Sequence, residues 1–520
     1  MTTVVGNRTL RSLLEYRARA APDRPFVIFD DLAGNVTRLS YGEFDTQVNR
    51  TANGLCALGV HYGDKINIHL PNCLEFLFLW FGAAKIGAII MPTNVASPVA
   101  ELEYLVEHSE SRLVFTDPQY LGIAEDVRDR CQRVQEVIVC GDSPSVDSGG
   151  ARFTDLIANQ SDVAPQAEVG PLDDAAVLYT SGTTARPKGV LVTQANYIYA
   201  GETVAKATSL GPDDRHFVVL PLFHGNAQYY STMSTLVTGA SMALTARFSA
   251  SRYFDRCIAH QCTIASLFAA PMRMLLAQER HAEHRNNRLR LVIYAQCITE
   301  AQLDEWHERF GAPLLQLWGM TETMGPPLMN PLAYERRNMS IGLPVMGYEV
   351  DLMQDDGESV APGEIGQIVV RGAPGWTLMK GYFKNPEATA ETIRGGWLWS
   401  GDNARQDSDG YFHFVDRAKD MIKRAGENVA ASEVEAVILQ HPDVFDCAVI
   451  GVADEVRDEK IKAYVVPREG SHLTGEAIIQ WCRARLATFR VPEIVEFRQQ
   501  LPRTSVGKIQ KHILRREGDA

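Results

Sequence analysis

Short apolar runs alternate with longer amphipathic segments through most of the chain, and polar turn residues separate them. Apolar runs bounded by turn residues predict strands, and apolar spacings of three and four predict helices. The predicted helices cover residues 10–20, 41–58 and 76–91, and another starts near residue 196. The predicted strands cover residues 26–29, 37–40, 65–70, 113–115, 137–139, 175–179, 189–193, 217–220, 263–270, 289–294, 448–452 and 463–466. This alternation is typical of an α/β fold with mainly parallel strands.

The most apolar stretch, residues 76–91, contains Lys85 and is too short to span a bilayer. We therefore expect a buried helix there. Residues 1–20 lack the apolar run of a signal peptide. The sequence thus predicts neither a transmembrane segment nor a secretory leader.

Length, charge and cysteine content narrow the class of protein. At 520 residues, the chain is long enough for two or more domains. A formal net charge of −13 argues against a general nucleic-acid binder, which would need a basic face. The 9 cysteines are scattered without a CxxC pair, which favours a reducing cytoplasm over a disulfide framework or a zinc site.

The segment 179–190 has the most distinctive chemistry in the chain. It joins two predicted strands and combines hydroxyls, glycines and one lysine, which together can surround phosphate oxygens. The residues expected to do so are Thr180, Ser181, Gly182, Thr183, Thr184 and Lys188. A Walker loop is excluded, because Pro187 stands where that motif has glycine. The alternative is a flexible hairpin without a ligand.

This loop resembles the phosphate loop of the acyl-adenylate-forming superfamily, which includes acyl-CoA ligases, peptide-synthetase adenylation domains and luciferases. Ala185 stands where the family usually has glycine. The resemblance extends over nearly the whole chain through further motifs in the same order. It implies a large N-terminal α/β domain that binds ATP and an acid, followed by a small mobile α/β lid.

A second motif lies in residues 314–323, a predicted strand followed by Thr321 and Glu322. Gly319 is expected to allow a tight turn, and a carboxylate beside phosphates suits magnesium. The alternative is an ordinary helix start with Thr321 as its cap. By resemblance, Trp318 stacks on adenine, Thr321 contacts phosphate and Glu322 holds Mg²⁺.

Two further positions are implied by the same resemblance. Asp402 can accept hydrogen bonds from both ribose hydroxyls, and Arg417 reaches the ribose and phosphates. Without the family context, Asp402 is equally well explained as a turn residue, and the charges of residues 416–420 as a solvated turn.

The C-terminal part is predicted as a separate lid. The expected division is residues 1–416, a hinge at 417–420 with Lys419 as the pivot, and residues 421–520. Ser432 is expected to cap a helix. By resemblance, Lys508 approaches the carboxylate and α-phosphate during adenylation, and Gly426 leaves room for the pantetheine arm of coenzyme A.

The acyl pocket is predicted to be short and polar. His224 and Asn226 follow the strand at 217–220, and Tyr294 and Gln296 stand where many relatives have a run of small residues. Met320, within the second motif, completes the set. A lone His224 is as easily explained as an ordinary loop histidine. This motif region most resembles carnitine/crotonobetaine-type and small-acid CoA ligases.

The predicted reaction has two steps: a small carboxylic acid attacks ATP to give acyl-AMP and pyrophosphate, and coenzyme A then displaces AMP. The alternatives are a stand-alone adenylation enzyme that loads a carrier protein, a ligase for medium-chain or aromatic acids, and a nucleotide-binding protein without catalysis. The expected cofactors are ATP, Mg²⁺ and coenzyme A. The oligomeric state is left open, with a homodimer as one option.

Overall fold

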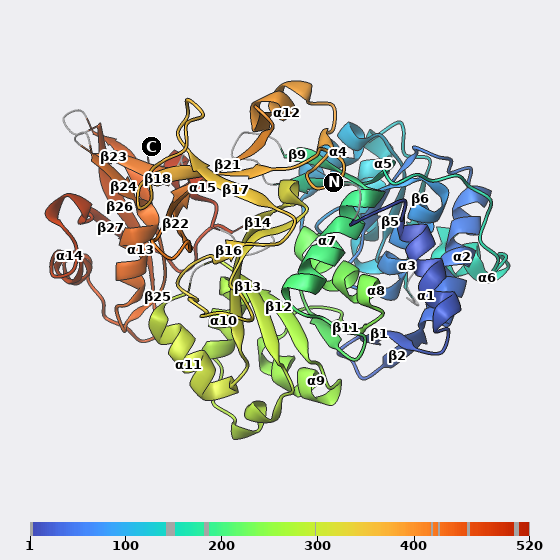
Figure 1. Cartoon of the computed structure of the whole chain (residues 1–520), viewed down its shortest axis with the longest axis horizontal. Coiled ribbons are helices and arrows are strands. Elements are labelled where there is room, and N and C mark those ends of the chain that lie inside the picture. Colours follow the sequence, from blue (N-terminus) through green and yellow to red (C-terminus); the bar gives the residue numbers. More distant parts are fainter. Residues whose placement is uncertain are drawn as a thin grey trace.

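The computed structural model describes residues 4–141, 151–180, 187–296, 298–417, 420–424, 427–454, 458–503 and 509–518. Within these ranges the strands form four sheets (Figure 1). The first two sheets carry the N-terminal domain. The third sheet is formed within residues 349–417, a range that also supplies one strand of the second sheet, and the fourth belongs to the C-terminal domain.

The first sheet has nine described strands and is parallel at its centre, from β1 through β11, β10, β12 and β13 to β14. Antiparallel strands finish both edges. In spatial order the strands are β16 (Leu343–Pro344), β15 (Gly325–Met329), β14 (Leu314–Met320), β13 (Leu291–Ala295), β12 (Ile264–Phe268), β10 (Arg215–Val218), β11 (Ser241–Thr245), β1 (Pro25–Asp30) and β2 (Val36–Ser40).

The second sheet has eight described strands and is parallel from β8 to β7, while β9 and β19 add antiparallel strands at one edge. Its order is β19 (Gly381–Tyr382), β9 (Lys188–Thr193), β8 (Asp174–Thr180), β4 (Ile89–Pro92), β3 (Lys65–His69), β5 (Ser111–Thr116), β6 (Glu136–Val139) and β7 (Ala151–Arg152).

The remaining two sheets are mainly antiparallel. The third contains β17 (Glu349–Met353), β18 (Ile365–Arg371), β21 (Trp397–Gln406), β20 (Ile393–Arg394) and β22 (Phe412–Arg417). The fourth contains β24 (Glu427–Ala430), β23 (Met421–Arg424), β26 (Asp458–Pro467), β25 (Val444–Asp454) and β27 (Ile494–Phe497).

Helices cover the sheets and line the core. The described α-helices are α1 (Leu10–Ala20), α2 (Tyr41–Ala57), α3 (Leu74–Ile86), α4 (Val99–Ser109), α5 (Leu121–Arg130), α6 (Phe153–Ala158), α7 (Gln194–Ala207), α8 (Ser234–Thr238), α9 (Tyr253–Ala259), α10 (Ala269–Leu276), α11 (Glu300–Phe310), α12 (Pro386–Thr392), α13 (Ala431–Leu439), α14 (Gly475–Arg483) and α15 (Lys511–Gly518). A π-helix, η2 (Asn226–Met233), and a 3₁₀ turn, η5 (Thr321–Thr323), also contribute to the site. Among the described helices, none has both the length and the apolar character that a bilayer crossing requires.

Helix α7 packs between the first two sheets and connects them. It contacts β9 of the second sheet and β15 of the first, and most of its residues are buried. Its N-terminus is fixed by a capping box between Thr193 and Asn196. In Figure 1 it lies between the N-terminal helices on the right and the strands β12–β14 at the centre.

The C-terminal domain has its own apolar cores, separate from the large core that ends near Phe412. In Figure 1 it lies at the left. The α/β prediction with a large N-terminal and a smaller C-terminal domain is confirmed. The boundary at residues 417–420 stays a prediction, since Lys419 lies outside the described residues.

Two predictions about helices were wrong. Residues 76–91 do not form one buried helix: α3 ends at Ile86, Gly87 adopts a left-handed conformation (φ 72°), and β4 follows. Lys85 is fully buried in α3, where its ammonium pairs with the Asp45 carboxylate at 2.6 Å. Ser432 does not cap α13, which begins at Ala431; instead its hydroxyl donates to the Val415 carbonyl.

Candidate functional site

The predicted site residues are carried by three sheets, and side-chain contacts link the first sheet to each of the other two. The second sheet supplies Thr180 and Lys188 at facing positions on β8 and β9. The first sheet supplies Trp318 and Glu322 from β14 and η5. The third sheet supplies Asp402 on β21 and Arg417 on β22, which are paired across the two antiparallel strands.

Asp402 joins two of these sheets. Its Oδ2 accepts a hydrogen bond of 2.9 Å from the Trp318 indole, and its Oδ1 lies 3.2 Å from Arg417 Nε. Asp402 and Trp318 are buried, whereas Arg417 is partly exposed. A buried carboxylate held by two donors has a fixed orientation. The structure therefore brings together three residues that the sequence assigned to one nucleotide.

Glu322 is buried in the short turn that follows β14. Its Oε1 accepts a hydrogen bond of 2.9 Å from the hydroxyl of Tyr382, and its backbone carbonyl accepts one of 2.9 Å from the Met379 amide. The side chain and the backbone of Glu322 are thus both held by the segment that leads into β19.

Magnesium bound with a nucleotide takes most of its ligands from phosphate oxygens and water, and only one or two from protein carboxylates. The single carboxylate of Glu322 suits such an ion. Within the part of the chain that the structure describes, no three His, Cys, Asp or Glu side chains gather closely enough for an all-protein metal site. Thr321, half-buried beside Glu322, could supply a hydroxyl to the same ligand.

Gly319 has a different role from the expected one. Its φ lies outside the left-handed region, and β14 continues through it to Met320. A Cβ at this position would lie 2.6 Å from the Tyr230 hydroxyl and 2.7 Å from the Gly325 carbonyl. Gly319 is therefore required by close packing and not by a turn.

Lys188 begins β9, and its ammonium lies 5.0 Å from the ring centroid of Tyr382. Tyr382 therefore contacts both Lys188 and Glu322. The remaining phosphate-loop candidates Ser181, Gly182, Thr183 and Thr184 lie outside the described residues, as do Gly426 and Lys508.

The π-helix η2 borders the site on another side. His224, which precedes it, is half-buried with its ring 4.7 Å from that of Phe223. Asn226 is half-buried, and its Oδ1 accepts a hydrogen bond of 2.8 Å from Ser266. Tyr229 is fully buried, and its hydroxyl has no hydrogen-bond partner among the described residues. Burial raises its pKa strongly, with the Glu322 charge adding to the effect. π-Helices of this kind frequently mark functional sites.

Tyr294 and Gln296 lie at the end of β13. Tyr294 is fully buried, and its hydroxyl donates to the Asn338 carbonyl at 2.8 Å. Gln296 is half-buried and has a left-handed backbone conformation (φ 70°). Its backbone carbonyl accepts a hydrogen bond of 3.2 Å from Gln316 Nε2. Of the two, Gln296 has the more accessible side chain.

Two contacts at the site were not predicted. Tyr382, in β19, contacts both Glu322 and Lys188, and it was not among the predicted site residues. His108, on α4, bonds through Nδ1 to the Tyr179 hydroxyl at 2.7 Å, just before the phosphate loop. Neither contact has a local sequence signal, because each joins elements that are distant in the chain.

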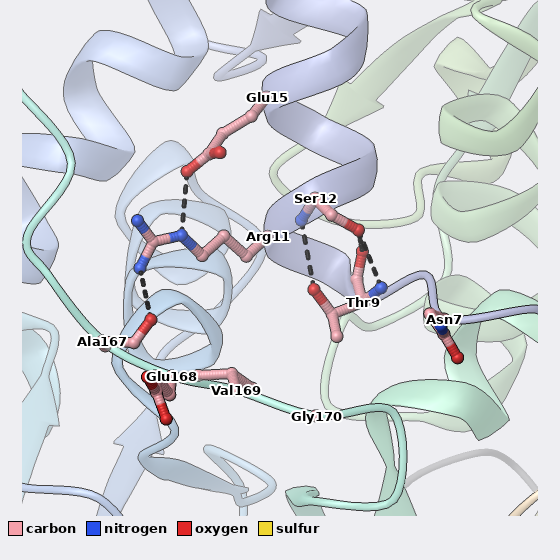
Figure 2. Close-up of a pocket in the computed structure, with 9 residues that line it drawn as sticks. All are labelled: Asn7, Thr9, Arg11, Ser12, Glu15, Ala167, Glu168, Val169 and Gly170. Carbon is pink, nitrogen blue, oxygen red and sulfur yellow. Dashed lines mark hydrogen bonds and ion pairs between the residues drawn. The ribbon is translucent and has the colours of Figure 1, made fainter.

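A cavity of about 600 Å³ lies elsewhere, between the start of α1 and residues 167–170 (Figure 2). None of the predicted site residues lines it. Arg11 lines this cavity, and its guanidinium is already engaged. Its Nε donates to Glu15 Oε1 at 3.0 Å, and its Nη1 donates to the Ala167 carbonyl at 3.3 Å. We therefore place the functional site at the junction of the three sheets.

Comparisons with known proteins show which family this chain resembles. Residues 14–383 match the family model described as AMP-binding enzyme, and residues 433–508 match that of the AMP-binding enzyme C-terminal domain. A crotonobetaine/carnitine–CoA ligase from Salmonella heidelberg (strain SL476) is 37% identical over 515 residues, which cover 98% of this chain and 100% of the relative.

Solved structures are also similar along their whole length. An anthranilate CoA ligase, AuaEII, in complex with anthranoyl-AMP superposes with a TM-score of 0.91 at 27% identity, covering 98% of this chain and 97% of that one. ATP-bound MatB from Rhodopseudomonas palustris gives a TM-score of 0.89 at 27% identity, covering 98% and 99%.

Proposed function

The chain belongs to the family of AMP-binding enzymes, and we propose that it activates a short carboxylic acid with polar or cationic substituents. It is an ATP-dependent acyl-CoA ligase of the AMP-forming type, which works through an acyl-adenylate. The observation that supports the short polar acid is the set of half-buried, hydrogen-bonding residues His224, Asn226 and Gln296. A long hydrocarbon chain would need an apolar pocket instead.

In this proposal, different residues bind different parts of ATP during the first step. Lys188 and the hydroxyls of its loop hold the triphosphate, Asp402 holds the ribose, and Trp318 supports the adenine. Glu322 would hold Mg²⁺, which when bound would neutralise phosphate charge. Positioning and charge stabilisation then carry the attack of the carboxylate, and a protein nucleophile is not needed.

The second step requires coenzyme A, and the lid is proposed to turn between the two steps. We also propose a reducing, cytoplasmic setting, because the 8 cysteines within the described ranges are all free thiols. A homodimer is a further proposal, to be checked by light scattering.

The acid and the acceptor can be tested in one assay. Pyrophosphate release is measured with short, hydroxylated, betaine, aromatic and long-chain acids, each with free coenzyme A. The proposal predicts the highest kcat/KM for a short polar or betaine acid. A preference for long-chain or aromatic acids would contradict it. Adenylation without thioester formation from free coenzyme A would favour a carrier-loading enzyme.

Replacing Gln296 with glycine is expected to enlarge the pocket and admit larger acids. Glycine adopts a positive φ readily, so Gln296→Gly removes the side chain without backbone strain. Acids one carbon longer should gain about tenfold or more in kcat/KM relative to the native acid, since one methylene is worth roughly 1–3 kcal/mol. The chain-length profile of kcat/KM measures this effect.

The matched control is Gln261→Gly, another glutamine with a positive φ (53°), which lies between α9 and β12. It should leave the profile unchanged. If both variants gave the native profile, Gln296 would not line the pocket. Tyr294→Gly is a less clean test, because loss of a fully buried aromatic ring costs about 3–5 kcal/mol of stability.

A further inference from the structure

Tyr382 lies at the contact between two sheets of the site. It is the second residue of β19, which pairs antiparallel with β9 through Gly381 to Leu191 and Tyr382 to Val190. The next amide, that of Phe383, donates to the Gly189 carbonyl at 2.7 Å. This pairing fixes the Tyr382 backbone beside the start of β9, where the phosphate-loop lysine stands.

The opposite side of the same segment is also anchored. The Tyr382 amide donates to the Thr389 hydroxyl of α12 at 2.8 Å. At Met379 the segment donates to the backbone of Glu322. Because both ends are held, the Tyr382 ring has little freedom, and only 8% of its surface is exposed.

The ring makes two charged contacts at once. Its hydroxyl donates to Glu322 Oε1 at 2.9 Å, and the Lys188 ammonium lies 5.0 Å from its centroid. A hydrogen bond to a carboxylate is about twice as strong as a neutral one, and a cation near a ring face is attracted by the ring quadrupole. One side chain thus fixes both an anion and a cation.

The hydroxyl remains a donor at neutral pH. The ordinary pKa of a tyrosine side chain is about 10, well above neutral pH. The phenol therefore stays protonated through the physiological range.

We propose that Tyr382 is a positioning residue that holds the Glu322 carboxylate and the Lys188 ammonium in a fixed relation, so that magnesium and the triphosphate of ATP are bound together. The inference rests on the proposed function, since it assumes that Glu322 faces magnesium and Lys188 faces phosphate. It predicts that Tyr382 matters for a nucleotide that carries a β- and a γ-phosphate with magnesium, and not for AMP.

Two variants separate the contributions of the two contacts. Tyr382→Phe keeps the ring beneath Lys188 and removes only the hydroxyl, whereas Tyr382→Leu removes both contacts. The control is Tyr41→Phe, which removes another buried hydroxyl, bonded to the Ala240 carbonyl at 2.7 Å and remote from the site. Circular dichroism and thermal melting check that each variant folds.

Binding is measured by calorimetry on the whole protein without acid or coenzyme A, using ATP with magnesium, ATP with EDTA, and AMP. Tyr382→Phe is expected to weaken binding of ATP with magnesium by about tenfold, the scale of one charged hydrogen bond, and to leave ATP with EDTA and AMP near native values. Tyr382→Leu should weaken ATP in both conditions. Tyr41→Phe should change none of them.

The inference is overturned if Tyr382→Phe binds ATP with magnesium as the native protein does. It is also overturned if AMP binding falls in the same proportion, since that would indicate a general structural role. Failure of the proposed function would look different: the native protein would bind ATP with magnesium but release no pyrophosphate with any acid. The binding comparison among variants would still decide the role of Tyr382.

Discussion

Glu322→Gln is expected to slow acyl-adenylate formation by about 100- to 1,000-fold, the cost typical of removing one electrostatic contact to a developing charge. Glutamine keeps the shape of the side chain and can still accept from the Tyr382 hydroxyl, which now lies 2.9 Å from Glu322 Oε1. The fold should therefore survive, while the negative charge that suits magnesium is lost. Pyrophosphate exchange at saturating ATP, with magnesium varied, measures the effect.

The matched control is Glu335→Gln, which neutralises an exposed glutamate paired with Arg337 at 2.9 Å. It should leave exchange unchanged. A further expectation is that Glu322→Gln requires more magnesium for half-maximal rate. Native exchange by Glu322→Gln at saturating magnesium and ATP would show that this carboxylate does not serve the metal.

Roles at the site could be predicted from the sequence where a motif keeps several residues together. Trp318, Thr321 and Glu322 lie within five positions of one another, and resemblance to the family suggested a role for each. Their contacts were not predictable. The hydrogen bond from Trp318 to Asp402 joins residues 84 positions apart, on two different sheets.

Tyr382 shows the same limit more sharply. Its contacts with Lys188 and Glu322 arise because β19 adds to the edge of β9, and a two-residue strand has no periodicity to detect. Only tertiary pairing brings the hydroxyl to the carboxylate.

The errors in secondary structure have equally local causes. Residues 76–91 are apolar apart from Lys85, and such an apolar run fits a buried helix and a buried strand equally well. Gly87 ends α3 in a left-handed conformation, which separates the two elements. Ser432 has the side chain of a good cap, but its hydroxyl donates to the Val415 carbonyl of β22. The helix therefore starts at Ala431, two residues earlier than a Ser432 cap would place it, and has no side-chain cap.

Lys508→Ala is expected to slow the first half-reaction by orders of magnitude and to spare the second. Lys508 lies outside the described residues, which end at Arg503 and resume at Ile509. Arg503 and Ile509, which flank it, pair antiparallel, and the Arg503 guanidinium binds the Asp446 carboxylate. Asp446 Oδ1 also lies 3.7 Å from Arg273 Nη1 of α10, so this part of the lid contacts the large domain.

A single lysine charge is well suited to the first step, because it offsets the charge on the attacking carboxylate and on the oxygens of the α-phosphate. Loss of that charge should slow pyrophosphate exchange by about 100- to 1,000-fold. Thioester formation from synthetic acyl-AMP and coenzyme A needs no such offset, since AMP is already the leaving group. It should proceed at close to the native rate.

The complementary variant is Gly426→Leu, which is expected to block the pantetheine arm and slow only the second half-reaction. Lys419→Pro, at the predicted pivot, should fix φ and impair whichever step needs the turned lid. Lys508→Ala and Gly426→Leu, both on the small domain, would then each impair a different half-reaction. This is the result expected if the lid presents one face to the active site in the first step and another face in the second. If Lys508→Ala instead slowed both half-reactions equally, the lid would not alternate in this way, and Lys508 would serve ATP binding or the fold in general.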